Sequence, residues 1–294
     1  MPKQKILILG VTGMLGHTLF KSLLATGRYQ VFGTARSVNG LDQFFTEDEK
    51  RLIRSFVDAD NFDTVIRALA SVQPDIVINC IGLIKQLHIG SDPLTAITIN
   101  AQLPHRISLI CRAANARLIH ISTDCVFDGK AGMYTESDTT SPTDLYGRTK
   151  LLGETTYPHC VTLRTSIIGH ELKEKLGLVE WFLAQKATVR GFTGAIYSGF
   201  PTLELAKIIE EHVLPYDDLS GLYHVSSAPI SKYDLLHIIK KYYNLTTVIE
   251  SDYDFSCDRS MNSERFMKST GYTPPDWDAL VSAMHQDFIT RYTK

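Results

Sequence analysis

Hydrophobic and polar positions in the first half of the chain follow two alternating patterns. Short apolar runs predict buried strands near residues 5–9, 30–33, 52–57, 75–80, 117–121 and 160–164. Amphipathic stretches between them predict helices near 14–26, 62–72, 99–115 and 144–156. Several runs, including ILIL and DIVINC, are apolar at consecutive positions, as expected for parallel strands that helices cover on both faces. The alternation therefore predicts an α/β protein with a parallel sheet.

After about residue 165 the pattern is less regular. It predicts helices near 177–187, 203–214, 231–242 and 277–292, and strands near 188–192, 221–226 and 246–250. No stretch rich in Pro, Gly or Ser separates this half from the first. We therefore expect a second lobe that is interleaved with the first.

Composition and charge exclude several classes of function. The 294 residues carry a formal net charge of -2, which gives no electrostatic reason to expect nucleic acid or a membrane as a partner. No apolar run approaches the roughly 20 residues that span a bilayer, and the N-terminus lacks the features of a signal peptide, so we expect a cytoplasmic protein. The five cysteines are scattered and form no CxxC pair, which predicts reduced thiols and no metal site.

The first predicted strand runs directly into GVTGMLG at residues 10–16, and a helical pattern follows. Glycines at these positions allow a tight turn and a close approach to a pyrophosphate, and the start of the helix offers free N–H groups. A plain tight turn is the alternative, but the strand–loop–helix context favours a dinucleotide site in a Rossmann-type, doubly wound sheet. The predicted contacts in this loop are Gly10, Thr12, Gly13, Met14, Leu15 and Gly16.

The residue after the second strand indicates which dinucleotide binds. An NAD site usually has an acid there, whereas this chain has Arg36, which suits a 2′-phosphate. We therefore predict NADP as the cofactor, with NADPH preferred and NADH as an alternative; a solvated loop arginine is the other interpretation. Further contacts are expected where later strands end at the same edge of the sheet, at Asp58, Ala59, Cys80, Ile81 and Gly82.

The segment DLYGRTK at residues 144–150 places Tyr146 and Lys150 one helical turn apart on one face. Asp144 is a suitable N-cap for this helix. A free tyrosine has a pKa of about 10, and a nearby ammonium group favours the phenolate and lowers that pKa. We therefore expect Lys150 to lower the pKa of Tyr146. An ordinary exposed helix pair is the alternative.

Three motifs occur in the order GxxGxxG (10–16), STDxVFDG (122–129) and YGRTK (146–150). This combination resembles the extended short-chain dehydrogenase/reductase family, in particular its dTDP-4-dehydrorhamnose reductase branch, and the resemblance covers most of the chain. It implies hydride transfer from NADPH to a ketone carbon, with a proton from Tyr146. Lys150 would also bind the nicotinamide ribose, and Thr123 would hold the substrate oxygen. The implied substrate is a nucleotide-activated 4-keto-6-deoxy sugar in deoxysugar and cell-surface polysaccharide biosynthesis.

Cys125 departs from the pattern of this branch. The related 4,6-dehydratases have a glutamate here that acts as a base on carbon, and the rhamnose-type reductases commonly have tyrosine. A cysteine occurs in GDP-fucose synthases and plant-type UDP-rhamnose synthases, where it is an acid/base for epimerisation. Cys125 is therefore a candidate acid/base if its thiol pKa is lowered; a small buried apolar residue is the alternative. His170, Glu171 and Lys173 are candidates for a second epimerisation residue by location alone.

The resemblance also suggests a division of the chain. Residues 1–165 are expected to form the NADP-binding Rossmann domain, completed by parts of 188–226. Residues 166–187 and 227–294 would then form mainly a smaller α/β substrate-binding lobe. Candidate substrate contacts are Lys85, Gln86, His88 and Arg259, with loop-surface and salt-bridge roles as alternatives.

Two further expectations concern partners. Related enzymes often pair through the helices near 99–115 and 144–156, so we expect a homodimer. A non-catalytic NADP-binding regulatory subunit, of the kind found in methionine adenosyltransferase, shares the fold and stays open as an alternative. The sequence does not specify the nucleotide base, the sugar or the stereochemical outcome.

Overall fold

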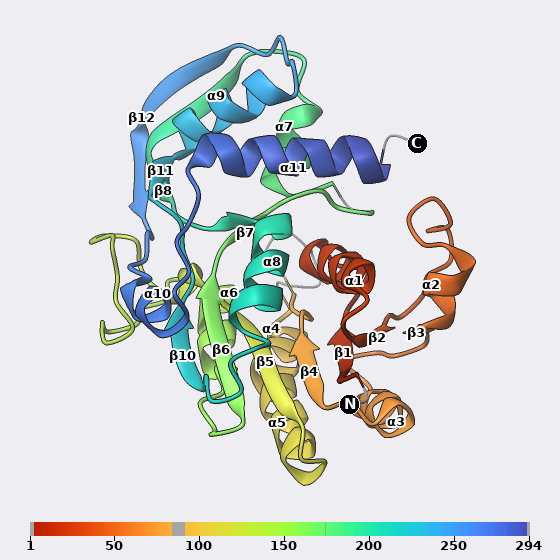
Figure 1. Ribbon diagram of the computed structural model, residues 1–294. Helices are drawn as coiled ribbons and strands as arrows, with labels where there is room; N and C mark the ends of the chain where they lie inside the picture. Colours follow the sequence, from red (N-terminus) through yellow and green to blue (C-terminus); the bar gives the residue numbers. More distant parts are fainter. Residues whose placement is uncertain (1–2, 84–91, 174, 293–294) are drawn as a thin grey trace.

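The computed structural model describes residues 3–83, 92–173 and 175–292. Its centre is a seven-stranded, all-parallel sheet in the order β10-β6-β5-β4-β1-β2-β3 (Figure 1). The strands are β1 (Lys5–Leu9), β2 (Gln30–Thr34), β3 (Ile53–Arg54), β4 (Ile76–Asn79), β5 (Arg117–Thr123), β6 (Cys160–Thr165) and β10 (Gly221–His224). The chain proceeds outward from β1 to β3 and then returns to β4 on the other side of β1. The ends of β1 and β4 therefore meet at the position where an open α/β sheet binds its ligand.

Helices cover both faces of this sheet because its strands are apolar on both sides. Ile6 and Ile8 of β1 belong to a core beneath α1 (Met14–Thr26) and α8 (Thr202–His212). Leu7 and Leu9 of the same strand belong to a second core beneath α3 (Phe62–Val72) and α5 (Leu103–Ala113). Alternate residues of one strand point to opposite faces, so one short sequence supplies both cores. The predicted α/β class with a parallel, doubly wound sheet is confirmed.

The later part of the chain adds a second lobe. Its main sheet has the order β11-β8-β12, from β8 (Val189–Tyr197), β11 (Ile230–Ser231) and β12 (Ile249–Asp258); β7 (Ile167–Ile168) pairs with β9 (Phe200–Pro201). The helices are α7 (Leu178–Leu183), α9 (Lys232–Tyr242), α10 (Glu264–Thr270) and α11 (Trp277–Tyr292). Of the segment 188–226, β10 and α8 pack with the large sheet, whereas β8 lies in the small one.

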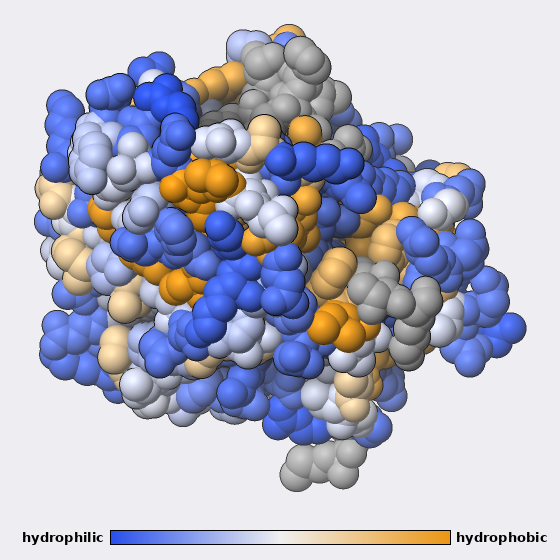
Figure 2. All heavy atoms as spheres, turned by 90° about the horizontal axis from the view of Figure 1, so that it is seen from above, coloured by the Kyte–Doolittle hydropathy of each residue, from blue (hydrophilic) through white to orange (hydrophobic). Residues whose placement is uncertain are grey.

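The long helix α11 crosses above α8 and α1 and packs against α8 (Figure 1). Seen from above, hydrophilic residues surround small, separate apolar patches (Figure 2). Among the described residues, no helix is long and apolar enough to cross a membrane.

Several predicted elements differ from the observed ones. The strand expected over 52–57 is only Ile53–Arg54, because Phe56 takes a positive φ of 62° that ends the extended backbone. The helix expected over 99–115 begins earlier, with α4 (Pro93–Ala96), and passes through a π-helical segment, η2 (Ile97–Gln102), before α5. A short helix, α2 (Glu47–Arg51), is held by a capping box between Thr46 and Glu49.

Candidate active site

The loop after β1 has the backbone geometry that a dinucleotide requires. Gly10 has a φ of 85°, in the left-handed region that favours glycine. A Cβ at Gly16 would lie 2.1 Å from the Gly10 carbonyl oxygen, so only glycine lets α1 begin this close to the loop. Gly13, the N-cap, is exposed, and among the described residues no side chain caps α1 and no acid lies in its first turn. The N–H groups of this turn therefore suit an anionic pyrophosphate.

The other predicted cofactor residues gather at the same edge of the sheet. Arg36 and Asp58 are exposed just beyond β2 and β3, and the Val57 N–H donates to the Ala35 carbonyl at 3.1 Å, which joins the two strand ends. Beyond β4, Ile81 lies against the glycine loop, since a Cβ at Gly10 would be 3.0 Å from its Cγ1. Cofactor contacts at these residues stay a prediction.

Three of the predicted catalytic residues, Thr123, Tyr146 and Lys150, meet at the carboxyl end of β5. Thr123 is the last residue of that strand; its hydroxyl donates to Asp124 Oδ1 at 3.0 Å and accepts the Cys125 N–H at 3.2 Å. Tyr146, on helix α6 (Leu145–Leu152), is hydrogen-bonded through its side chain to Thr123. Lys150, one turn further along α6, donates from Nζ to the Ile121 carbonyl at 2.6 Å.

The pKa of Tyr146 is shifted in the direction opposite to the expected one. Burial raises it above its usual value of 10.0, Cys125 and Asp124 add to that rise, and the hydrogen bond with Thr123 opposes it. Burial also lowers the pKa of Lys150 from 10.5 to about 8, while Glu154 and Cys80 oppose that change. The expectation that Lys150 lowers the pKa of Tyr146 is therefore wrong for this structure, because desolvation dominates. Tyr146 is protonated at neutral pH and has a proton to donate.

Helix α6 is held in place by its first residues. The carboxylate of Asp144 accepts the Gly147 N–H at 2.8 Å, which confirms Asp144 as the N-cap. Gly147 lies against the turn that follows β5, since a Cβ there would be 2.2 Å from the Cys125 carbonyl oxygen. The glycine in YGRTK thus brings Tyr146 within reach of Thr123.

Cys125 is half-buried in the turn η3 (Asp124–Val126), with its Sγ 3.5 Å from Nη1 of Arg259. Arg259 also donates from Nε to the Phe127 carbonyl at 3.0 Å and from Nη2 to the Thr143 hydroxyl at 3.4 Å. The guanidinium group therefore places a positive charge beside the thiol, which favours a thiolate. Among the described residues, the hydrogen bonds of Arg259 go to Cys125, Phe127 and Thr143.

A buried ion pair anchors the end of α6. Glu154 accepts from Arg164 at both carboxylate oxygens, each at 2.8 Å, and from the Ser122 hydroxyl at 2.7 Å. Arg164 also lies 3.2 Å from Nε2 of His224 on β10. Bidentate geometry and a third hydrogen bond make this pair a rigid link between α6, β5 and β6. The negative charge of Glu154 also keeps the pKa of Lys150 from falling further.

The candidates for a second epimerisation residue are mostly engaged elsewhere. His170 lies between Glu180 (2.6 Å from Nδ1) and Tyr243 (2.7 Å from Nε2) and is buried. Glu171 accepts the Gly177 N–H at 2.7 Å. Lys173 is exposed. These contacts explain His170 and Glu171 as structural residues of the loop before α7.

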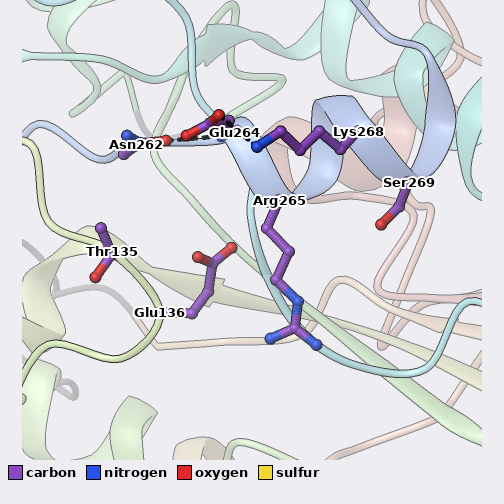
Figure 3. Close-up of a pocket in the computed structure, with 7 residues that line it drawn as sticks. All are labelled: Thr135, Glu136, Asn262, Glu264, Arg265, Lys268 and Ser269. Carbon is purple, nitrogen blue, oxygen red and sulfur yellow. Dashed lines mark hydrogen bonds and ion pairs between the residues drawn. The ribbon is translucent and has the colours of Figure 1, made fainter.

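Three predicted substrate contacts, Lys85, Gln86 and His88, lie outside the described residues. A surface pocket of about 380 Å³ lies beside α10 and is separate from the catalytic residues (Figure 3). Its cations are already engaged, because Lys268 pairs with Glu264 at 2.6 Å and Arg265 lies over the Tyr223 ring at 4.7 Å. We assign no ligand to this pocket.

Sequence reasoning missed the polar residues that surround Lys150. Asn100, in the π-helical segment η2, binds both backbone groups of Leu83 with its amide, at 2.9 and 3.1 Å. A Cβ added at Gly82 would lie 3.5 Å from Oδ1 of Asn100 and 3.9 Å from Nζ of Lys150, so both polar groups lie beside this glycine. His120 is buried within β5 beside Asn79 of β4. The available signal was a polar residue inside an otherwise apolar strand, such as His120 in RLIHI.

Comparisons with known proteins agree with this geometry. The family described as "RmlD substrate binding domain" matches residues 4–289. A dTDP-4-dehydrorhamnose reductase of Aggregatibacter actinomycetemcomitans is 27% identical over 94% of this chain and 97% of its own. The beta subunit of methionine adenosyltransferase 2 of Rattus norvegicus is 33% identical, over 52% of this chain and 42% of its own.

The fold is also found among solved structures. The crystal structure of a dTDP-4-dehydrorhamnose reductase from Bacillus anthracis in complex with NADP has a TM-score of 0.80 and 20% identity, and the match covers 97% of this chain and 100% of that one. Because the family match spans nearly the whole chain, both lobes included, this protein belongs to the RmlD substrate-binding-domain family, within the extended short-chain dehydrogenases/reductases.

Proposed function

We propose that this protein is an NADPH-dependent reductase of a nucleotide-activated 4-keto-6-deoxy sugar. The observation that carries the proposal is the meeting of Thr123, Tyr146 and Lys150 at the end of β5, beside a loop suited to a dinucleotide. The similarity to dTDP-4-dehydrorhamnose reductases over almost the full chain supports the substrate class. None of the five cysteines forms a disulfide, which fits a reducing compartment, so a cytosolic location belongs to the proposal.

The roles of the residues follow from their geometry. The glycine loop at residues 10–16 and Lys150 would hold a nicotinamide cofactor, which would supply hydride to the ketone carbon. Thr123 holds the ketone oxygen, and Tyr146 gives its phenolic proton to that oxygen as it becomes an alkoxide. Lys150, buried one turn away, stabilises the phenolate that remains. The raised pKa of Tyr146 keeps the proton in place until the substrate oxygen takes it.

The test is a panel of dTDP-, UDP- and GDP-4-keto-6-deoxy sugars, monitored by the loss of NADPH absorbance. Tyr146→Phe should lower kcat by about 10²-fold or more and leave the Kd for NADPH unchanged. Tyr157→Phe is the matched control, because that phenol contacts His105 instead of the site. Normal turnover by Tyr146→Phe would refute the mechanism. NADPH binding without turnover of any sugar nucleotide would support the regulatory-subunit alternative.

Epimerisation next to the ketone is a second candidate activity, which the 3.5 Å distance between Cys125 Sγ and Arg259 favours. A thiolate stabilised by Arg259 removes a proton from the carbon beside the ketone, and a thiol returns one before reduction. In deuterated water this exchange labels the product at that carbon, and Cys125→Ser should abolish the label while preserving reduction. Product without solvent deuterium would exclude epimerisation.

We also propose that two copies pair through α4, η2, α5 and α6. Apolar side chains are exposed on this face at Leu94 (77%), Leu109 (62%) and Leu152 (64%). Nε2 of His105 lies 2.8 Å from the carbonyl oxygen of Leu152. Since His105 is one turn before Leu109 on α5, Leu109 and Leu152 are neighbours on this face. Light scattering should show a dimer that Leu109→Glu dissociates, whereas Val248→Glu, at an exposed valine of the other lobe, should not. A wild-type monomer would refute this pairing.

A further inference from the structure

His120 occupies an unusual position beneath the catalytic helix. It is fully buried on β5, between Leu118 and Ser122 on the same face of the sheet. Leu118 belongs to the core beneath α3 and α5, and Ser122 binds Glu154 just beyond α6. The imidazole therefore lies on the face of the sheet that η2, α5 and α6 cover. The next residue along β5, Ile121, supplies the carbonyl that accepts from Lys150.

The hydrogen bonds of Asn79 fix the tautomer of His120. Asn79 Oδ1 accepts the Ile81 N–H at 3.1 Å, so the amide nitrogen is the group that faces His120 Nδ1 at 3.2 Å. An amide nitrogen only donates, and Nδ1 must therefore accept. Burial and the charge of Lys150 lower the pKa of His120 well below 6.5, so the ring is neutral. Its single proton is then on Nε2.

This Nε2–H group has no hydrogen-bond partner among the described residues. A buried donor without an acceptor destabilises the folded protein, and internal water molecules commonly satisfy such groups in polar surroundings. Lys150 is close enough for its charge to act on the imidazole. Its ammonium group has three donors, one of which goes to the Ile121 carbonyl. A single water molecule has two lone pairs, one for His120 and one for Lys150.

We propose that His120 is a positioning residue that holds an internal water molecule against the ammonium group of Lys150. The proposal rests on the reductase function above and adds a residue to its mechanism. The water hydrates a cation whose pKa burial lowers, and keeps it in position behind Tyr146. The titratable groups that act on Lys150 are Glu154 beyond α6 and Cys80 beyond β4, and those that act on His120 are Lys150 on α6 and His105 on α5.

Two variants of His120 test this role. His120→Leu removes the donor, and His120→Gln retains an N–H near the position of Nε2. Without the water, the ammonium group loses its proton more easily. His120→Leu should therefore move the alkaline limb of the kcat–pH profile to lower pH by roughly one unit, while His120→Gln should restore the wild-type limb. An unchanged limb in a folded His120→Leu protein would overturn the proposal.

A second measurement does not depend on turnover or on a variant that folds. ¹⁵N NMR of the wild-type protein with labelled histidine should show a neutral ring that is protonated at Nε2, with a cross-peak from that N–H to water. A ring protonated at Nδ1, or an Nε2–H without contact to water, would overturn the proposal. If the NMR result holds and no sugar nucleotide is reduced, the assigned water survives and the proposed reductase function fails.

Discussion

Replacing Gly147 with alanine tests whether the close packing of α6 positions Tyr146. Alanine in place of a helical glycine ordinarily stabilises a protein by about 0.5–1 kcal/mol. Here the added Cβ would lie 2.2 Å from the Cys125 carbonyl oxygen and 2.9 Å from Cβ of Pro142. Both neighbours are held by the chain, so the new methyl group cannot be accommodated by turning a flexible side chain.

The size of the effect follows from these distances. An ordinary contact requires at least 3.4 Å, so the start of α6 must move by roughly 1 Å away from η3. That movement separates the hydroxyl groups of Tyr146 and Thr123. Misplacement of a catalytic group by about 1 Å costs on the order of 10²-fold in rate. We therefore expect kcat to fall by about 10²-fold, with a loss of about 1–3 kcal/mol in the free energy of unfolding.

NADPH oxidation with the best sugar nucleotide of the panel measures the first quantity, and urea unfolding measures the second. Arg148→Ala is the matched control, since it places alanine at the next position of the same helix, where the side chain is exposed. It should leave both quantities near the wild-type values. A Gly147→Ala protein that is more stable and turns over normally would show that the close approach to Cys125 does not position Tyr146.

Three further predictions concern charged residues. Arg36→Ala should raise the KM for NADPH by roughly tenfold or more, because a charge-assisted hydrogen bond to phosphate is worth about 1.5–3 kcal/mol. The KM for NADH should change by less than about twofold, and steady-state kinetics in which both KM values rise equally would contradict the prediction. Lys150→Met should abolish reduction yet raise the free energy of unfolding at pH 7 by about 1–3 kcal/mol. The pKa of Lys150 in the folded state is lowered from 10.5 to about 8, so the unfolded chain binds this proton more tightly. In urea unfolding, the stability gained by Lys150→Met should therefore shrink as the pH rises from about 8 to 10.5. Glu154→Gln should destabilise the protein by about 3–5 kcal/mol, because Arg164 would stay buried without its carboxylate; a loss below about 1 kcal/mol in chemical denaturation would disprove it.

The sequence alone determined the elements that depend on local chemistry. The expected boundaries of β1, α1, α3 and α11 match the structure. Local features set several of these limits: an uninterrupted apolar run in β1, glycines at both ends of α1 and a strong hydrophobic period in α3. The glycine loop and the Asp144 cap are also correct, since a tight turn and an N-cap are formed by neighbouring residues. The expected order of these motifs along parallel strands was enough to bring Thr123, Tyr146 and Lys150 together.

Only the tertiary structure decided the properties that depend on residues far apart in the chain. The pKa of Tyr146 is raised where a helical pair alone suggests a lower one, because burial removes water from the phenol. The π-helical turn that positions Asn100 and the pairing of Glu154 with Arg164 have no local signature. The tautomer of His120 depends on Asn79 of a neighbouring strand. Desolvation and hydrogen bonds across the sheet depend on how distant segments pack together, so the hydrophobic periodicity along the chain cannot predict them.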